Sequence, residues 1–198
     1  MNILVFGGSF NPPHKGHVKL LQAAAQQVPF DLIYVIPTNV PPHKENKVVS
    51  GEHRVNMLNA IDWQLPVTVS DIELKREGKS YTFDTLSQLR ELHPDDQLYF
   101  LIGSDMLFSF DKWYRYQDLL KMAHFCVSGR TDEDFALLAP YVQKLEEEGG
   151  HFVTLTLDPI EISSTDLRAM IAADEDTSEY LNEGVIKYIK ENHLYETI

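Results

Sequence analysis

The sequence has little of what marks secreted, membrane-bound or nucleic-acid-coating proteins. Its only cysteine is Cys126, so no disulfide can form within the chain, and a cysteine inside an apolar run is most simply an inert buried thiol. No apolar stretch approaches the length of a membrane span. Residues 1–6 carry no basic leader and form too short an apolar run for a signal peptide. We therefore expect a soluble, cytoplasmic protein that makes no membrane contact.

Basic residues are also scarce. The chain has 17 Lys and Arg against 30 Asp and Glu, a formal net charge of −13, which argues against nonspecific binding to a nucleic-acid backbone. Residues 1–50 differ, because they carry four basic side chains and two acidic ones, a net charge of +2. This local excess permits a bound small anion, while an acidic surface that resists aggregation is an equally compatible interpretation.

Short apolar runs alternate with amphipathic patterns along the 198 residues. The runs predict buried strands at 3–6, 32–36, 67–69, 98–102, 125–127 and 152–155, and the patterns predict helices at 16–27, 51–61, 82–92, 133–148, 163–172 and 182–192. Such alternation produces right-handed βαβ units and a parallel sheet with helices on both faces. We expect one domain over 1–198, an α/β, Rossmann-like doubly wound parallel sheet with C-terminal helices.

Open sheets of this kind bind ligands outside the carboxyl ends of their strands. The unusual residues of this chain follow strand ends, at 7–17 after the first strand, at 37–44 after the second and at 103–105 after the fourth. These three segments are therefore the first candidates for a ligand site.

The segment after the first strand has the residues of a phosphate site. Gly7-Gly8 lets the backbone approach a ligand closely, and Pro12-Pro13 stiffens the loop. The helix that follows points free N–H groups and its positive dipole end into the same space. His14 and His17 are three positions apart and can face one point. With Lys15 they form a cradle for a phosphate undergoing substitution, which needs charge stabilisation and alignment.

Other interpretations of this segment are weaker. It is neither the Gly-x-Gly-x-x-Gly dinucleotide fingerprint nor a Walker loop, because Gly-Lys-Ser/Thr is absent. A His-x-x-His pair could bind a metal, but no cysteine or third nearby ligand completes that site. A single histidine near a helix start is usually structural. Two of them, after a glycine pair and a double proline at the end of a buried strand, favour function.

A second phosphate-binding pattern opens the helix predicted at 163–172. Ser163 with Asp166 resembles a capping box, which is a routine way to begin a helix. Three hydroxyls (Ser163, Ser164 and Thr165), exposed helix N–H groups and Arg168 one turn later also suit an oligophosphate. The two interpretations are compatible.

Both patterns resemble motifs of one superfamily. His14-x-Gly16-His17 after Gly-Ser-Phe-Asn-Pro resembles the signature of the nucleotidyltransferases that share a fold core with class I aminoacyl-tRNA synthetases. Residues 162–168 match the Ile-Ser-Ser-Thr-x-x-Arg motif of the same superfamily. Within it, the whole chain resembles the bacterial nicotinate-nucleotide adenylyltransferases. Asn11 stands where this family commonly has Asp, and it keeps the turn chemistry without the charge.

The resemblance implies a set of site residues for ATP. It assigns charge stabilisation at the α-phosphate to His14 and His17, with Lys44 as a helper, and the grip on the departing pyrophosphate to Thr165 and Arg168. The expected catalytic residues are His14, His17, Lys44 and Arg168. The expected ATP contacts are Gly8, Ser9, Phe10, His14, His17, Gly103, Asp105, Ser163, Ser164, Thr165 and Arg168. No resident protein metal site is expected, and Mg²⁺ would accompany ATP.

Three further segments bear on the acceptor. Residues 41–44 resemble the Pro-Pro-His-Lys loop of the family, although a plain proline-rich turn explains them alone. Residues 80–85 resemble its Ser-Tyr-Thr-x-Asp-Thr segment, where amides at a helix start receive the nicotinate carboxylate, although an ordinary N-capped helix explains them too. A tryptophan after the Gly-x-Asp turn stacks on the pyridine ring in the family. The expected acceptor contacts are Asn39, Lys44, Tyr81, Thr82 and Trp113.

The resemblance implies the reaction of ATP with nicotinate mononucleotide to give nicotinate adenine dinucleotide and pyrophosphate, a step of NAD biosynthesis. The acceptor phosphate would attack the α-phosphorus in line, without a nucleophilic residue. Two alternatives stay open: an acceptor such as nicotinamide mononucleotide or phosphopantetheine, and a nucleotide sensor without turnover. The expected partners are these small molecules alone, with the oligomeric state undetermined.

Overall fold

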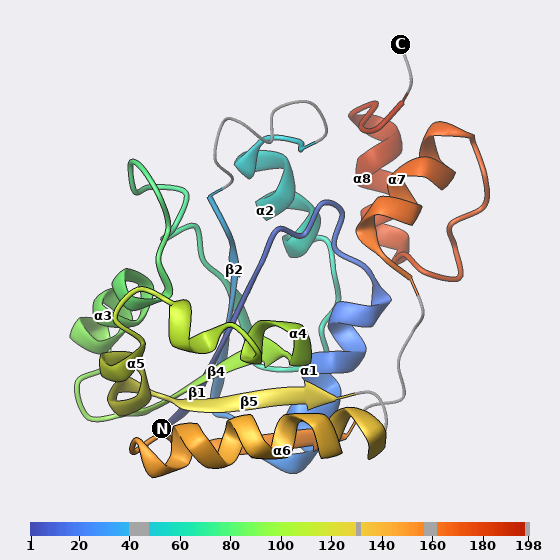
Figure 1. The fold of residues 1–198 in the computed structure, drawn as a ribbon. Coiled ribbons are helices and arrows are strands. Elements are labelled where there is room, and N and C mark those ends of the chain that lie inside the picture. Colours follow the sequence, from blue (N-terminus) through green and yellow to red (C-terminus); the bar gives the residue numbers. More distant parts are fainter. Residues whose placement is uncertain (40–47, 130–131, 157–161, 197–198) are drawn as a thin grey trace.

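The computed structural model describes residues 1–39, 48–129, 132–156 and 162–196. Strands and helices alternate along most of the chain (Figure 1). In order they are β1 (Asn2–Gly8), α1 (Lys15–Gln27), β2 (Leu32–Pro37), α2 (Gly51–Asn59), β3 (Val67–Val69), α3 (Thr82–Leu92), β4 (Gln97–Gly103), α4 (Ser104–Leu107), the 3₁₀ turn η2 (Phe110–Lys112), α5 (Tyr116–Met122), β5 (His124–Gly129), α6 (Asp132–Glu147), β6 (Phe152–Thr156), α7 (Ser164–Ala172) and α8 (Glu183–Glu191).

The six strands form one parallel sheet in the order β3-β2-β1-β4-β5-β6. The chain builds outward from β1 in one direction and then returns to β4 on its other side. A crevice opens at such a reversal of strand order, outside the carboxyl ends of the two central strands. β1 ends at Gly8 and β4 ends at Gly103, so two of the three segments singled out by the sequence flank this switch point. The predicted doubly wound α/β fold is confirmed.

Both faces of the sheet are covered, which explains why the strands are nearly continuous apolar runs. Successive residues of β1 point to opposite faces, and Ile3, Leu4 and Val5 are all fully buried. One core cluster joins the sheet to α1, α2, α7 and α8, and the other joins it to α3, α4, α5 and α6. The C-terminal helices are therefore part of one covering layer and share its core.

α8 is fixed against α2, far from it in sequence. The hydroxyl of Tyr188 lies 3.0 Å from His53 Nδ1 and accepts a hydrogen bond from Asn56 Nδ2 at 2.9 Å. Gly184 permits the close approach, because a Cβ there would lie 2.2 Å from the carbonyl oxygen of Ala60. This packing holds α7 and α8 at the same end of the molecule as α2 (Figure 1).

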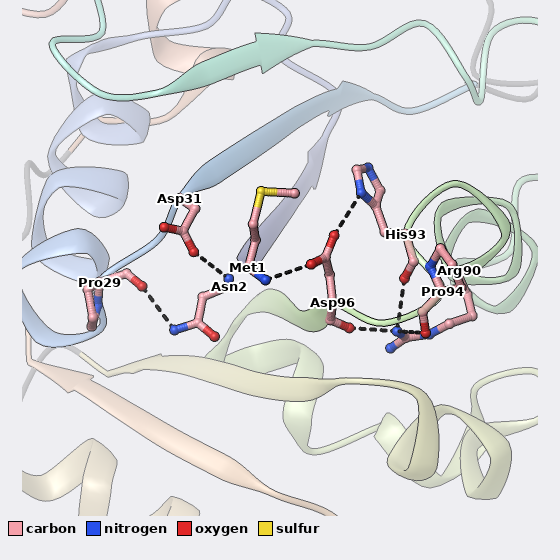
Figure 2. A network of polar contacts seen from close by, with 8 residues as sticks. All are labelled: Met1, Asn2, Pro29, Asp31, Arg90, His93, Pro94 and Asp96. Atoms are coloured by element: carbon pink, nitrogen blue, oxygen red, sulfur yellow. Dashed lines mark hydrogen bonds and ion pairs between the residues drawn. The ribbon is translucent and has the colours of Figure 1, made fainter.

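The amino end of the sheet carries a polar network of its own (Figure 2). The ammonium group of Met1 lies 2.6 Å from Asp96 Oδ1, and Asp96 Oδ2 lies 3.2 Å from His93 Nδ1. The guanidinium of Arg90 donates to the carbonyl oxygens of His93, Pro94 and Asp96. The network ties the start of β1 to the turn between α3 and β4.

Three short elements were not predicted from the sequence: α4, η2 and α5, all within 104–122. Each has at most seven residues, too few for a periodic pattern to emerge. None of the helices in the described ranges is both long and apolar enough to span a membrane. Cys126 is buried, as predicted, and burial raises the pKa of its thiol to about 12.

Candidate active site

The loop between β1 and α1 is shaped by an aromatic side chain beneath it. Phe10 adopts a left-handed backbone conformation (φ 47°), and its ring folds back under Gly8, where a Cβ would lie 2.9 Å from the ring. The ring is 1% exposed and packs edge-on against Phe6 and His17. Phe10 therefore supports the loop from below, and only its backbone is available to a ligand.

His14 and His17 form a reciprocal capping box at the start of α1. His14 Nδ1 accepts from the Gly16 N–H at 3.2 Å, and His17 Nδ1 accepts from the His14 N–H at 3.0 Å. The two ring centroids are 3.8 Å apart. The structural and functional interpretations of these histidines therefore apply together, since the contacts that begin the helix also fix both rings side by side.

These contacts determine the protonation state of both rings. Because each Nδ1 accepts a hydrogen bond, the proton of each neutral ring lies on Nε2. Burial lowers the pKa of His14 to about 4. Burial, followed by the neighbouring His14, lowers the pKa of His17 well below its ordinary value. At neutral pH the pair is uncharged and offers two Nε2–H donors, which suits hydrogen bonding to charge that develops on a phosphate.

The N-terminus of α1 is closed, contrary to expectation. The backbone N–H of Lys15 donates to the carbonyl of Tyr180 at 2.8 Å, and its Nζ donates to the carbonyl of Ser178 at 2.8 Å. The N–H groups of Gly16 and His17 are bound by His14. The prediction that free α1 amides join the phosphate cradle is wrong, because Tyr180 accepts from the Lys15 N–H and His14 accepts from the N–H groups of Gly16 and His17.

The N-terminus of α7 is open instead. Ser163 caps the helix, with its hydroxyl bonded to both the N–H and the carboxylate of Asp166, so the predicted capping box is confirmed. Asp166 and Leu167 donate to Ser163. No described residue accepts from the N–H of Ser164 or Thr165. Two helix-terminal donors therefore remain for an anion, at the positive end of the dipole.

α7 lies directly against the first loop. Ser164 Oγ donates to the carbonyl of Pro12 at 3.0 Å, and Arg168 donates to the carbonyl of Asn11 at 2.8 Å and to Thr165 Oγ1 at 3.1 Å. These bonds join segments about 150 positions apart in sequence. The structure thus brings together the two phosphate-binding patterns.

Asn11 anchors the loop to the end of the described chain. Its Oδ1 accepts from the Tyr195 hydroxyl at 2.7 Å and from the Val49 N–H at 3.3 Å. Burial raises the pKa of Tyr195, so its hydroxyl stays protonated and can donate. Sequence analysis assigned no role to Tyr195. A tyrosine after the last helix gave no signal that it reaches residue 11.

Arg54 on α2 was also missed. It is 3% exposed, and its NH1 donates to the carbonyls of Ser9 at 3.0 Å and Thr38 at 2.8 Å. Its Nε donates to the carbonyl of Val49 at 3.3 Å. An arginine in an amphipathic helix is normally an exposed residue, and only the fold shows that this one points inward to the loops after β1 and β2.

The start of α3 carries two of the residues predicted to contact the acceptor, Tyr81 and Thr82. Tyr81 makes no side-chain cap, and no described residue accepts from the N–H of Thr82. The ring of Tyr81 lies 4.8 Å from that of Tyr114, the neighbour of Trp113. Trp113 is half-buried with one side against Phe110, at 5.1 Å between ring centroids. The structure therefore brings the predicted acceptor residues of α3 near Trp113.

A buried polar cluster of Glu73, Arg76 and Thr85 lies next to the start of α3. The hydroxyl of Thr85 donates to Glu73 Oε1 at 2.7 Å and accepts from Arg76 at 2.6 Å. Asn39, after β2, donates to the backbone carbonyl of Arg76 at 3.2 Å. Asn39 is therefore joined, through Arg76, to the same cluster as the start of α3. Lys44, predicted for both catalysis and acceptor binding, lies outside the described residues.

The turn after β4 completes the crevice. A Cβ on Gly103 would lie 2.7 Å from Asp105 Oδ1, so glycine makes room for this carboxylate in the first turn of α4. Within the described part of the chain, no three His, Cys, Asp or Glu side chains are grouped closely enough to hold a metal ion. The carboxylate of Asp105 is the kind of oxygen ligand that suits Mg²⁺, an ion that usually takes one or two protein carboxylates together with substrate phosphates.

Comparison with known proteins agrees with this geometry. Residues 5–170 match the family model described as cytidylyltransferase-like. The chain is 37% identical over 192 residues to a probable nicotinate-nucleotide adenylyltransferase of Oceanobacillus iheyensis, covering 96% of this chain and 95% of the relative. It is 36% identical over 195 residues to the nicotinate-nucleotide adenylyltransferase of Bacillus subtilis, covering 98% and 97%.

Solved structures share the fold over the same length. The Plasmodium falciparum nicotinic acid mononucleotide adenylyltransferase complexed with NaAD superposes with a TM-score of 0.75 at 22% identity, covering 98% of this chain and 97% of that one. The same enzyme complexed with APC gives a TM-score of 0.74, covering 98% and 96%. The strand order, the paired histidines at the switch point and the near full-length identities converge: the chain belongs to the cytidylyltransferase-like family and, within it, to the nicotinate-nucleotide adenylyltransferases.

Proposed function

We propose that this protein transfers AMP from ATP to nicotinate mononucleotide and releases pyrophosphate. The observation that carries the proposal is the open N-terminus of α7 against the loop that holds a neutral histidine pair, with a second open N-terminus at α3. α7 lies against the loop that holds His14 and His17, and the start of α3 lies on the side of Asn39. One open terminus suits the oligophosphate of the donor, and the other suits the carboxylate of the acceptor.

The donor phosphates bind between the first loop and α7. The free N–H groups of Ser164 and Thr165 point to the β- and γ-phosphates, and Arg168 adds a positive charge already held by its bonds to Asn11 and Thr165. Gly8 and Ser9 contribute close backbone approach, and Gly103 with Asp105 lies on the adenosine side. Mg²⁺ bound with ATP would supply charge neutralisation for the departing pyrophosphate, beside the open amides of Ser164 and Thr165 and the cation of Arg168.

Charge stabilisation at the α-phosphate comes from the histidine pair. Attack by the acceptor phosphate in line with the departing pyrophosphate spreads negative charge over the equatorial oxygens. The Nε2–H groups of His14 and His17 donate to these oxygens, and the capping bonds at Nδ1 keep both donors in place. Neutral rings do not repel Mg²⁺, so the lowered pKa values suit a metal-bound nucleotide. Lys44 is proposed as a further cation at this step.

The acceptor binds across the β1–β4 switch point. Its carboxylate meets the open N–H groups at Tyr81 and Thr82, and its pyridine ring stacks on the accessible part of Trp113. An uncharged carboxamide gains less from a helix N-terminus than a carboxylate does. This difference favours nicotinate over nicotinamide mononucleotide. We further propose that the chain works as one domain in the cytoplasm.

One assay tests the function. ATP-dependent pyrophosphate release is measured with nicotinate mononucleotide, nicotinamide mononucleotide and phosphopantetheine at equal concentrations. Release with the first acceptor, at a kcat/KM at least about tenfold above the other two, is expected. A preference for the uncharged amide would overturn the nicotinate assignment, and no release with any acceptor would favour a nucleotide sensor.

A further inference from the structure

Arg54 is a buried cation whose observed hydrogen-bond acceptors are all backbone carbonyls. Burial lowers its pKa, but a guanidinium stays protonated at neutral pH. Among the residues that the structure describes, no carboxylate lies within ion-pair distance of it. Three carbonyls accept its bonds, from Ser9, Thr38 and Val49. Burying a charge without a carboxylate partner costs free energy, so a buried Arg54 calls for a function that offsets this cost.

The carbonyl groups that bind Arg54 belong to two loops, one proposed to bind ATP and the other proposed to bind the acceptor substrate. Ser9 lies in the loop after β1, on the ATP side, and Thr38 precedes Asn39, on the acceptor side. One nitrogen, NH1, donates to both carbonyls, at 3.0 and 2.8 Å. The same two loops are joined once more by the Thr38 N–H, which donates to the carbonyl of Gly8 at 2.8 Å. A single planar group therefore sets the spacing between the loops.

We propose that Arg54 is a positioning residue, which holds the ATP loop and the acceptor loop at the spacing that in-line attack requires. The inference rests on the proposed transfer reaction for its kinetic consequence. Arg54 touches neither substrate and acts through the backbone of Ser9 and Thr38. Misplacing reactants by about 1 Å costs on the order of 100-fold in rate, so the loss of this spacing affects turnover more than the binding of either substrate.

Arg90 provides a matched control within the same chain. It also donates from a helix to backbone carbonyls at the opposite end of the sheet, those of His93, Pro94 and Asp96 (Figure 2) and that of Met122. Its replacement removes a comparable set of charged hydrogen bonds and leaves the substrate loops untouched. Any effect of general destabilisation is therefore shared by Arg54 and Arg90 variants.

The experiment compares Arg54→Met and Arg54→Lys with Arg90→Met. Methionine keeps the apolar stem without donors, and lysine restores the charge without the planar fork. For Arg54→Met, kcat per folded protein is expected to fall on the order of 100-fold, with the Kd of a non-hydrolysable ATP analogue changed less than about threefold. Arg54→Lys should recover part of the loss, and Arg90→Met should retain kcat. Equal kcat in Arg54→Met and Arg90→Met would overturn the proposal.

Amide hydrogen exchange gives a readout that does not depend on the identity of the acceptor. In Arg54→Met, exchange at Thr38 should speed up relative to wild type, because its N–H bonds to Gly8 across the loop spacing. Arg90→Met should leave that amide unchanged. Unaltered exchange at Thr38 in Arg54→Met would refute the proposal that Arg54 holds the two loops at a fixed spacing. A wild-type protein inactive with every acceptor would refute the proposed function and leave the exchange result valid.

Discussion

The two ends of the parallel sheet use the same residue types in opposite ways. At the amino end, His93 has a carboxylate partner in Asp96, which also binds the ammonium of Met1. At the carboxyl end, His14 and His17 contact each other and backbone N–H groups, and each keeps an Nε2–H donor. A histidine paired with an acid contributes to stability, whereas a buried neutral pair leaves donors for a ligand.

The comparison explains how one sheet combines stability with chemistry. Groups at the amino end satisfy each other, so nothing there needs a ligand. At the carboxyl end, the open amides of α3 and α7 have no acceptor among the described residues. Unused donors and unpaired charges are costly in a folded protein and mark the place where a substrate supplies the partners.

The largest expected effect comes from His17. His17→Asn keeps an oxygen near the position of Nδ1, so it still accepts from the His14 N–H, but it loses the Nε2–H donor. We expect kcat to fall on the order of 100- to 1000-fold with the fold intact. His17→Gln places an amide near Nε2 and should lose less turnover. Steady-state kinetics measures both, and His93→Gln at the other end should keep wild-type kcat. Near-normal turnover in His17→Asn would remove this ring from the mechanism.

A smaller kinetic effect is expected from Arg168. Replacing it with methionine removes the cation beside the open amides of α7, so the KM for ATP should rise roughly 10- to 100-fold. The KM for the acceptor should change little, because the acceptor binds at the start of α3. Arg90→Met is the control, since Arg90 donates to backbone carbonyls at the amino end of the sheet, away from the open N-termini of α3 and α7. An equal rise in both KM values for Arg168→Met would contradict a specific role in donor binding.

The pH dependence of stability sharpens the contrast further. The pKa of His14 is about 4 in the folded protein, against 6.5 ordinarily, so the unfolded chain takes up the proton first as pH falls. The contribution of neutral His14 to the free energy of unfolding is complete above about pH 6.5 and is lost between there and pH 4, by at most about 3.4 kcal/mol. Denaturant unfolding at pH 7.5 and 4.5 measures it.

His14→Asn is the matched variant for this prediction, because asparagine still caps α1 and does not titrate. It should flatten the acidic decline, with the remaining slope due partly to His17, whose pKa is also lowered. An acidic decline as steep as that of wild type would show that His14 is not the titrating group.

The smallest effect is expected at the amino end. The Asp96 carboxylate raises the pKa of the Met1 ammonium, and that ammonium lowers the pKa of Asp96. The contribution of the Met1 ammonium to folding stability is complete below pH 8.0, which is the ordinary pKa of this group. It is lost as pH rises through the raised pKa. Asp96→Asn should lower the thermal midpoint slightly at pH 7 and remove the alkaline decline. Turnover per folded protein should not change, and a loss of kcat would break the division between the two ends.

Much of the fold follows from the sequence because its strands are short apolar runs and its long helices are strongly periodic. The six strands and the helices α1, α2, α3, α6, α7 and α8 lie within two residues of their predicted bounds. The α4–η2–α5 segment was missed, since elements of seven residues or fewer show little periodicity.

The candidate site was predicted where chemistry is local and missed where it depends on distant partners. The histidine pair and the start of α7 are contiguous motifs, and the structure joins them as expected. Arg54 and Tyr195 act on residues far away in sequence, so no local pattern identifies them. The closure of α1 by the carbonyl of Tyr180 is equally invisible in the sequence.

The hydrogen bond between Asn11 and Tyr195 spans 184 positions of the chain. Protein synthesis proceeds at about 5–20 residues per second, so on the order of 10–40 s pass between the synthesis of Asn11 and that of Tyr195. A ribosome-bound chain can pair β1 with β2 early, but it cannot finish the phosphate loop. Messages cut short before residue 195 would thus yield a nearly complete sheet whose nucleotide site lacks its final anchor.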